Sequence, residues 1–411
     1  MYNLLYFWRT KNHLFMNYIL FDDTRRGNLL PMTFTRPVAD IRVGILTLRE
    51  KWEKYLGVKT SSLTEKYLEK KFPIVKESDN ILINGAVFPN QELISEINNL
   101  KANQALIRNE TVIAMHVTYE DLEGSGSKST ENTEEVLTKA TVTEICNLWD
   151  IFALNDQAIK DDFALITKGR KSQDVSKFTH LVNPENIFIE NDAKIGYGVI
   201  LNASDGPVYI GNKAEVMEGS MIRGSFALCE HSTVKMGAKI YGGTSVGPHS
   251  KVGGEVSNSV IFGYSNKAHD GYLGNSVLGE WCNLGADTNT SNLKNTYENV
   301  RLWNYPEQSF VDTGLQFCGL IMGDHSKSGI NTMFNTGTVV GVSSNIFGGN
   351  FQRNFISSFA WGGYTGFTTY NINKAIKVAE AVYKRRNIEF SDIDREIMKH
   401  VFNITFKYRK L

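Results

Sequence analysis

Residues 210–252 read IGNKAEVMEGSMIRGSFALCEHSTVKMGAKIYGGTSVGPHSKV, and a period of six runs through the whole stretch. Aliphatic residues occupy every sixth position: Ile210, Val216, Ile222, Leu228, Val234, Ile240, Val246 and Val252. The fourth residue after each of the first seven is small in all but one case: Ala214, Ser220, Phe226, Ser232, Ala238, Thr244 and Ser250. Three such hexads make one triangular coil of about 18 residues, with each aliphatic side chain pointing inward. A single coil cannot bury its own apolar side, so coils stack, with strands about 4.8 Å apart, into a parallel β-helix.

Interruptions of the period divide this solenoid. The rhythm begins upstream at Ile189, Ile195 and Leu201 and resumes three residues out of phase at Ile210, which predicts a bulge near 203–207. After Val252 it returns two residues out of phase at Leu278 and Leu284, so we expect 255–274 to protrude from the coil or distort it. A second interruption follows Thr290, and the hexads restart at Met322, Ser328, Phe334, Val340 and Ile346. Loops that leave a rigid solenoid are frequent sites of function.

The residues on either side of the repeats follow other patterns. Apolar strands at 18–21, 81–83 and 111–115 alternate with helical patterns at 43–55, 91–101 and 148–160, which favours an α/β domain with a parallel sheet. After Gly366, two amphipathic segments with Asn371 and Ser391 as expected N-caps predict C-terminal helices that cover the open end of the β-helix. The expected division is a leader at 1–15, the α/β domain at 16–167, the β-helix at 181–366 and the helices at 367–411.

Composition narrows the classes of function. The 411 residues carry 44 basic and 44 acidic side chains, so no net charge directs the chain to nucleic acid. No apolar run approaches the roughly 18 residues that a membrane span needs. The four cysteines, Cys146, Cys229, Cys282 and Cys318, form no CxxC pair, which argues against a disulfide framework or a zinc ribbon and favours a reducing cytoplasm.

His231 and His249 are the two candidate metal ligands in the repeats. His231 and His249 lie 18 residues apart, so we expect them directly above one another on adjacent coils. A histidine zinc site needs at least one further ligand, and no third histidine at a matching spacing is evident. The sequence therefore assigns no metal site.

Residues 266–294, NKAHDGYLGNSVLGEWCNLGADTNTSNLK, bring a histidine, a tyrosine and several amides together within two coils. The order His269-x-x-Tyr272-Leu-Gly-Asn275, followed by Asn283 and Asn292, resembles the acetyltransferase domain of bifunctional N-acetylglucosamine-1-phosphate uridylyltransferase/glucosamine-1-phosphate acetyltransferases. Residues 319–341, GLIMGDHSKSGINTMFNTGTVVG, are similar to the closing coils of that domain, and residues 255–269 to its archaeal branch. The resemblance implies a left-handed β-helix of hexapeptide repeats with acyltransferase activity.

The resemblance also implies roles for individual residues. His269 falls on the catalytic base, Tyr272 and Asn283 on sugar or phosphate contacts, Asn292 on a contact to the amino sugar, and Lys235 near a phosphate-binding position. A histidine that titrates near pH 7 suits this chemistry, because an amine attacks the acetyl thioester only when it is neutral. The implied co-substrate is acetyl-CoA. Because the family completes each site with a neighbouring β-helix, the resemblance also implies a homotrimer.

The N-terminal residues carry a second resemblance. NLLPMTFTRPVADIRVG at 28–44 and WDIFALN at 149–155 are similar to sugar-1-phosphate nucleotidyltransferases. The glycine-rich turn that would hold the nucleotide phosphates reads FDDTRRG at 21–27, Val38 replaces an expected lysine, and INGA at 83–86 stands where the family has a metal-binding aspartate. Two interpretations stay open: Arg25, Arg26 and Arg36 bind the nucleotide phosphates, with Mg²⁺ required if the nucleotidyl step is active, or the domain no longer performs that step.

Together these patterns predict a cytoplasmic transferase of sugar-nucleotide biosynthesis. The β-helix is expected to N-acetylate an amino-sugar phosphate of the glucosamine-1-phosphate type, and the reduced nucleotidyltransferase-like domain to bind UTP or dTTP, with uridylyl or thymidylyl transfer left open. Two alternatives remain: a nucleotidyltransferase whose β-helix only oligomerises it, and a non-catalytic sugar-nucleotide-binding scaffold. Neither nucleic acid nor a membrane is an expected partner.

Overall fold

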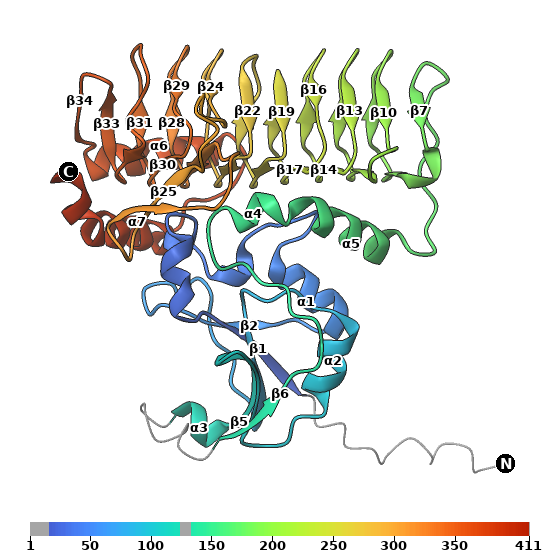
Figure 1. Ribbon diagram of the computed structural model, residues 1–411, viewed down its shortest axis with the longest axis vertical. Helices are drawn as coiled ribbons and strands as arrows, with labels where there is room; N and C mark the ends of the chain where they lie inside the picture. The colour runs from blue at the N-terminus through green and yellow to red at the C-terminus, as the bar shows by residue number, and fades with distance from the viewer. Residues whose placement is uncertain (1–15, 124–132, 411) are drawn as a thin grey trace.

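Figure 1 shows the computed structural model of the chain, which describes residues 16–123 and 133–410. An α/β domain lies beneath one face of a long solenoid, and C-terminal helices lie on the same side, beside the last coils. The expected fold class is confirmed: an N-terminal α/β domain, a parallel β-helix of hexapeptide repeats, and C-terminal helices. The leader proposed at 1–15 lies outside the described residues. Within the described ranges, no helix is long and apolar enough to cross a membrane.

The N-terminal domain is built on a six-stranded sheet whose strands are not all parallel. In spatial order the strands are β2 (Ser61–Leu63), β1 (Asn17–Phe21), β3 (Asp79–Asn84), β5 (Thr111–Thr118), β4 (Gln104–Arg108) and β6 (Glu134–Leu137). The parallel sheet expected from the sequence is therefore wrong, because β5 runs antiparallel to both of its neighbours. The tight turn at Asn109 and Glu110, both with positive φ, folds β4 and β5 into a hairpin.

Of the helices expected in this domain, the one at 91–101 begins at Gln91 as predicted, and the one at 43–55 begins later, at Leu48. The helices observed are α1 (Leu48–Leu56), α2 (Gln91–Asn98), α3 (Tyr119–Glu123), α4 (Asp150–Ala153) and α5 (Asn155–Thr167). A capping box between Thr47 and Glu50 sets the start of α1, and Gly57, with φ 72°, ends it. The segment expected as one helix at 148–160 is divided into α4 and α5.

Three faces of parallel strands make up the solenoid. Face A contains β7 (His180–Val182), β10 (Ile200–Asn202), β13 (Met221–Arg223), β16 (Lys239–Ile240), β19 (Glu255–Ser257) and β22 (Tyr272–Gly274). Face B contains β8 (Ile187–Ile189), β11 (Val208–Ile210), β14 (Phe226–Leu228), β17 (Thr244–Val246), β20 (Val260–Ile261), β23 (Val277–Leu278), β27 (Leu320–Met322), β30 (Thr338–Val340) and β32 (Phe355–Ile356). Face C contains β9 (Lys194–Ile195), β12 (Glu215–Val216), β15 (Thr233–Val234), β18 (Lys251–Val252) and β21 (Asn266–Lys267), then β28 (Lys327–Ser328), β31 (Asn345–Ile346) and β33 (Ala360–Gly363).

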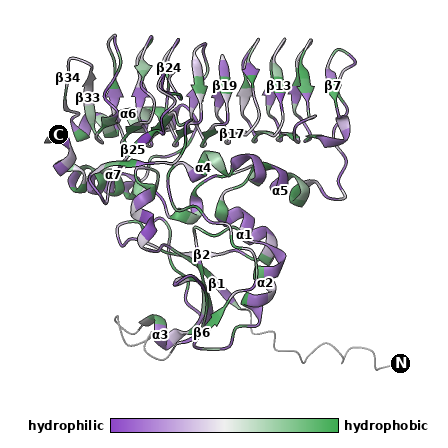
Figure 2. Ribbon diagram, viewed as in Figure 1, coloured by the Kyte–Doolittle hydropathy of each residue, from purple (hydrophilic) through white to green (hydrophobic). Residues whose placement is uncertain are grey.

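The interior of the solenoid is the apolar column that the period predicts. All eight aliphatic residues of the unbroken run, from Ile210 to Val252, are at most 2% exposed. They form one cluster with the inward residues of the later coils, such as Met322 and Val340. Figure 2 shows hydrophobic residues recurring along the strands from coil to coil. Burial of this column holds each coil on the next, since apolar burial stabilises by roughly 25 cal/mol per Å².

All three expected irregularities are present, and for 255–274 the structure decides between the two alternatives. The bulge at 203–207 is confirmed, because β8 and β11 pair Ile187 with Val208, three residues more than one regular coil. The second interruption, after Thr290, leaves the coil as a hairpin of β25 (Arg301–Asn304) and β26 (Ser309–Asp312). The segment 255–274 does not protrude as one alternative had it. It stays in the ladder as β19 to β22, and its coil is shortened, with Ser245 pairing with Val260 fifteen positions on.

The C-terminal helices are α6 (Ile372–Lys384) and α7 (Asp392–Ile404), and Asn371 and Ser391 cap them as predicted. They do not cover the open end of the solenoid. They pack on its flank, where Tyr383 of α6 stacks on Trp281 with ring centroids 3.9 Å apart. The last strand is instead covered by β34 (Gly366–Thr369), which runs antiparallel to β33. A second apolar cluster joins these helices, face B and the N-terminal domain.

Candidate active site

His269 lies on the edge where the chain passes from face C to face A. The strand registers align nine residues along this edge, one from each coil: Tyr197, Glu218, Met236, Gly254, His269, Ala286, Ile330, Gly348 and Tyr364. We call this set the edge row. Its large apolar members, Tyr197, Met236, Ile330 and Tyr364, are between 57% and 69% exposed. Large exposed apolar side chains that recur along one edge favour a surface for interaction.

The neighbours of His269 in the edge row leave its side chain uncovered. Gly254 precedes it and Ala286 follows it, so no side chain larger than a methyl group stands on either side. A Cβ on Gly254 would lie 2.8 Å from the carbonyl oxygen of His269, and φ at Gly254 is 71°. Only glycine permits this close approach in that conformation. The result is an exposed imidazole in a gap between Met236 and Ile330.

Tyr272 and Asn292 are brought together beside this edge. The side-chain amide of Asn292 donates hydrogen bonds to the Tyr272 hydroxyl at 3.1 Å and to Oδ1 of Asn275 at 2.8 Å. The backbone N–H of Tyr272 donates to Oδ1 of Asn289 at 2.8 Å. Burial raises the pKa of Tyr272, so its hydroxyl stays protonated at neutral pH. Asn275 and Asn289 were not singled out from the sequence, although Asn275 lies inside the recognised motif.

Asn283 and Lys235 occupy other positions on the same part of the solenoid. Asn283 lies on face C, where its backbone bridges Asn266 and Lys327, and its neighbour Leu284 points inward. Alternation along a strand therefore directs Asn283 outward. Lys235 is two coils before His269, and its Cβ lies 3.1 Å from the position of a Cβ on Gly253. Of the five residues expected at the acetyl-transfer site, the structure joins Tyr272 and Asn292 by a hydrogen bond.

In the N-terminal domain, the ends of β1 and β3 hold a network of paired charges. Arg25 forms ion pairs with Asp23 at 2.5 Å and with Glu144 at 2.6 Å. Asn84 donates to Oδ2 of Asp23 at 2.8 Å. Burial opposes it, but the hydrogen bonds from Arg25 and Asn84 hold the pKa of Asp23 below its ordinary value.

Arg26 is also paired with a carboxylate. Its Nε lies 3.2 Å from Oδ2 of Asp22, and its Nη2 donates to the Tyr67 hydroxyl at 3.0 Å. Asp22 also accepts from the backbone N–H of Val38 at 2.8 Å and from the Thr64 hydroxyl at 2.5 Å. Both carboxylates that could replace the missing metal ligand are therefore engaged by protein donors.

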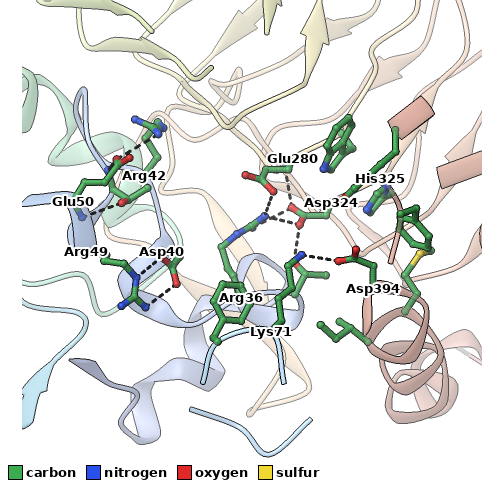
Figure 3. A pocket seen from close by; sticks show the side chains of 18 of the residues that line it. Arg36, Asp40, Arg42, Arg49, Glu50, Lys71, Glu280, Asp324, His325 and Asp394 are labelled. Carbon is green, nitrogen blue, oxygen red and sulfur yellow. Dashed lines mark hydrogen bonds and ion pairs between the residues drawn. The ribbon is translucent and has the colours of Figure 1, made fainter. Parts of the chain in front are cut away.

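Arg36 reaches away from this region to the β-helix, as Figure 3 shows. Its guanidinium donates to Asp324 at 3.1 Å and 2.6 Å and lies 3.1 Å from Glu280. The Thr35 hydroxyl donates to Asp324 at 2.6 Å. The side chains of Arg36 and Asp324 are 6% and 4% exposed, so this is a buried link between domains. The structure therefore places the three expected nucleotide-binding arginines in three separate carboxylate pairings.

A cavity lies around this link. It has a volume of about 490 Å³ and is bounded by the N-terminal domain, the β-helix and the C-terminal helices (Figure 3). Most of its cations already have carboxylate partners within the wall: Arg49 with Asp40, Lys71 with Asp394, and Arg36 with Asp324. This lining is a network of internal ion pairs rather than a row of free charges.

The two histidines considered for a metal do stack on adjacent coils. The rings of His231 and His249 are 4.8 Å apart and nearly parallel, and Tyr264 and Trp281 continue the stack. In the part of the chain that the structure describes, no group of three or more His, Cys, Asp or Glu side chains is arranged to hold a metal ion.

Comparisons with known proteins found similarity to sugar nucleotidyl transferases and to bifunctional GlmU proteins. Residues 18–171 match the family described as "Sugar nucleotidyl transferase". The bifunctional protein GlmU of Synechococcus elongatus is 25% identical over 235 residues, which are 52% of this chain and 48% of that protein. GlmU of Prochlorococcus marinus is 28% identical over 265 residues, covering 58% of this chain and 55% of that protein. GlmU of Methanococcus aeolicus is 30% identical over 168 residues, covering 40% and 39%.

Parts of the chain are therefore similar in sequence to the bifunctional GlmU proteins. It spans about half the length of the curated relatives it matches first. Among solved structures, a UDP-N-acetylglucosamine acyltransferase (LpxA) from Bacteroides fragilis aligns at 16% identity and TM-score 0.25, over 57% of this chain and 84% of that chain. A likeness that weak supports no functional assignment.

Proposed function

We propose that the β-helix of this chain transfers an acetyl group from acetyl-CoA to the amine of an amino-sugar phosphate, of the glucosamine-1-phosphate type. The observation that carries the proposal is the placement of His269. The motif histidine is exposed between Gly254 and Ala286, with the hydrogen-bonded pair Tyr272 and Asn292 on the adjoining face. An acceptor sugar bound there has a base for its amine and polar groups for its hydroxyls.

The reaction needs one proton acceptor and one site for developing charge. His269 takes the proton from the amine as the nitrogen attacks the thioester carbonyl. Backbone N–H groups stabilise the oxyanion that forms. The C–N bond then forms fully, the C–S bond breaks, and the imidazolium returns its proton to the departing thiolate, which leaves as free CoA. Tyr272, Asn283 and Asn292 hold the sugar, and Lys235 holds its phosphate.

The working unit in this proposal is a homotrimer. The edge row exposes Met236 and Ile330 on either side of His269. A second copy seated on this row buries both residues and closes the gap around the imidazole, and a three-fold arrangement gives each site one such neighbour.

For the N-terminal domain we propose nucleotide binding without nucleotidyl transfer. Asn84, a neutral amide, stands at the end of β3, and Asp22 and Asp23 are engaged by Arg26 and Arg25. Binding through Arg25, Arg26 or Arg36 remains a prediction, and it requires a phosphate to displace a carboxylate partner. The match of residues 18–171 to sugar nucleotidyl transferases favours a second candidate, an active UTP- or dTTP-dependent nucleotidyltransferase with Mg²⁺ and an oligomerising β-helix.

One assay separates these functions. The full chain is incubated with acetyl-CoA and, in turn, with glucosamine-1-phosphate, glucosamine-6-phosphate and other amino-sugar phosphates, while free thiol is followed. Acceptor-dependent thiol release is expected with at least one of them. Release that is no faster than acetyl-CoA hydrolysis for every acceptor leaves the nucleotidyltransferase and the non-catalytic scaffold as the remaining functions.

A further inference from the structure

Two inward positions of face C carry polar side chains, Lys267 and Ser328, and of these only Lys267 is ionisable. The inward residues of this face, coil by coil, include Ile195, Val216, Val234, Val252, Lys267 and Leu284. Lys267 pairs in register with Val252 and is only 2% exposed. Burying an ammonium is unfavourable unless its donors are satisfied, so an aliphatic residue would serve the solenoid better here.

Three backbone carbonyls satisfy this ammonium. Nζ of Lys267 donates to the oxygens of Gly253 and Asp270, each at 3.2 Å, and to the oxygen of His269. An ammonium has three N–H groups, so all are used. Two of the acceptors belong to the turn that carries His269, and the third belongs to the preceding coil.

The bonds therefore tie the His269 turn to the coil beneath it. The side chain of His269 is exposed, and Gly254 and Ala286 offer it no packing. The position of the imidazole then depends on the backbone of 268–271. Lys267 fixes that backbone from inside the solenoid, where no substrate reaches it.

We propose that Lys267 is a positioning residue for His269, holding the turn so that the imidazole faces the amine of the acceptor. This inference rests on the proposed acetyl transfer. In this inference a buried lysine affects the rate of the reaction although it makes no contact with substrate. A misplacement of about 1 Å at a reacting group can reduce turnover about 100-fold.

The test compares Lys267→Met with Lys251→Met. Methionine fills the inward position without a charge, and Lys251 is an exposed lysine on the outer side of the same face. With acetyl-CoA and glucosamine-1-phosphate, Lys267→Met is expected to lower kcat about 10- to 100-fold at unchanged KM for acetyl-CoA. Its thermal midpoint should equal or exceed that of the wild type. Lys251→Met should match the wild type in both, and a kcat within twofold of wild type in Lys267→Met overturns the proposal.

Amide hydrogen exchange gives a second readout, independent of activity. Peptides covering 268–271 should exchange faster in Lys267→Met than in the wild type, and those in Lys251→Met should not. If the wild type transfers no acetyl group, the proposed function fails while this measurement still decides whether Lys267 orders the turn. Unchanged exchange at 268–271 overturns the inference even if acetyl transfer is observed.

The pH profile distinguishes positioning from simple packing. Burial lowers the pKa of Lys267 to about 8, against the opposing charges of Asp270 in the turn and Asp287 on the next coil. Above that pH the neutral amine has two N–H groups for three carbonyls. The wild-type kcat should therefore decline above about pH 8, and Lys267→Met should lack this decline. An identical alkaline limb in both proteins argues against Lys267.

Discussion

At the residue scale, Arg36 pairs with a carboxylate in this structure. The segment Thr35-Arg36-Pro37 lies in the stretch that resembles sugar-1-phosphate nucleotidyltransferases, and one interpretation of that resemblance has Arg36 bind a nucleotide phosphate. The guanidinium of Arg36 is nevertheless buried against Asp324 of the β-helix. Burial disfavours the charge on Asp324, but Arg36 and the Thr35 hydroxyl more than offset this and hold its pKa below the ordinary value. The pair therefore stabilises the docking of the two domains rather than offering a free cation to a nucleotide.

This pair makes stability depend on pH. Asp324 has a folded pKa below its unfolded value near 3.9, so its contribution is fully present above that pH and is lost as pH falls through the folded pKa. Asp324→Asn leaves a buried Arg36 without its closest partner, and should destabilise by about 3–5 kcal/mol at pH 7. The difference in urea midpoint between wild type and variant should stay constant from pH 7 down to about pH 4 and become smaller as pH falls further. A difference that does not shrink below about pH 4 would show that the carboxylate charge is not responsible.

At the scale of elements, the period of six predicted the positions of the inward residues on the strands, because the period follows from the geometry of one coil. Every third hexad returns to the same face, so an inward aliphatic residue is required at each step, and the strand pairs obey that register. The segment 255–274 broke the pattern, and the sequence alone did not distinguish a protrusion from a shortened coil. Both change the phase of the hexads, and only the ladder from β17 to β20 decides between them.

Other features could not be predicted because they depend on contacts between distant residues. The pairing of Arg36 with Asp324 joins positions nearly three hundred residues apart. The antiparallel direction of β5 could not be predicted for a different, local reason: the turn at Asn109 and Glu110 contains no glycine that would mark it in the sequence. The position of His269 on the edge between faces C and A was not predictable either, because the period breaks at 255–274 and only the strand register places this residue.

The interior column makes a direct prediction at this scale. Leu228 is fully buried in face B, so Leu228→Ala should destabilise by about 2–5 kcal/mol, the sum of lost burial and the cavity left behind. Lys239→Ala, on the outer side of β16, is the control and should change stability by at most about 0.5 kcal/mol. Thermal unfolding followed by circular dichroism measures both. Equal midpoints for the two variants would mean that the coils are not held by their apolar interior.

At the scale of the whole molecule, the N-terminal domain and the C-terminal helices lie against face B (Figure 1), whereas the large apolar members of the edge row are exposed. The chain should therefore assemble through that row. Light scattering at micromolar concentration should give the mass of a trimer for the wild type. Met236→Asp and Ile330→Asp place charges into the interface and should shift the mass toward the monomer, whereas Lys251→Met should not. A monomeric wild-type protein would contradict the proposal that two copies of the chain share each site.

The N-terminal domain carries a prediction of its own. Nucleotidyl transfer needs a divalent cation to offset charge on the phosphates. The neutral amide Asn84 ends β3, where the resemblance implies a metal-binding aspartate. Pyrophosphate release from UTP or dTTP with a sugar-1-phosphate and Mg²⁺ should be weak or absent. Robust release that Asp22→Ala or Asp23→Ala abolishes would establish these carboxylates as metal ligands. Calorimetry with UTP reports whether binding is retained.

The central claim is that His269 is the base for acetyl transfer at the edge of the β-helix. The most direct measurement is the initial rate of thiol release from acetyl-CoA and glucosamine-1-phosphate, for the wild type and for His269→Ala side by side. The account predicts a rate lower by about 10²- to 10⁴-fold in the variant, with the same thermal midpoint and the same mass in solution. Equal rates of acetyl transfer in the two proteins would contradict it.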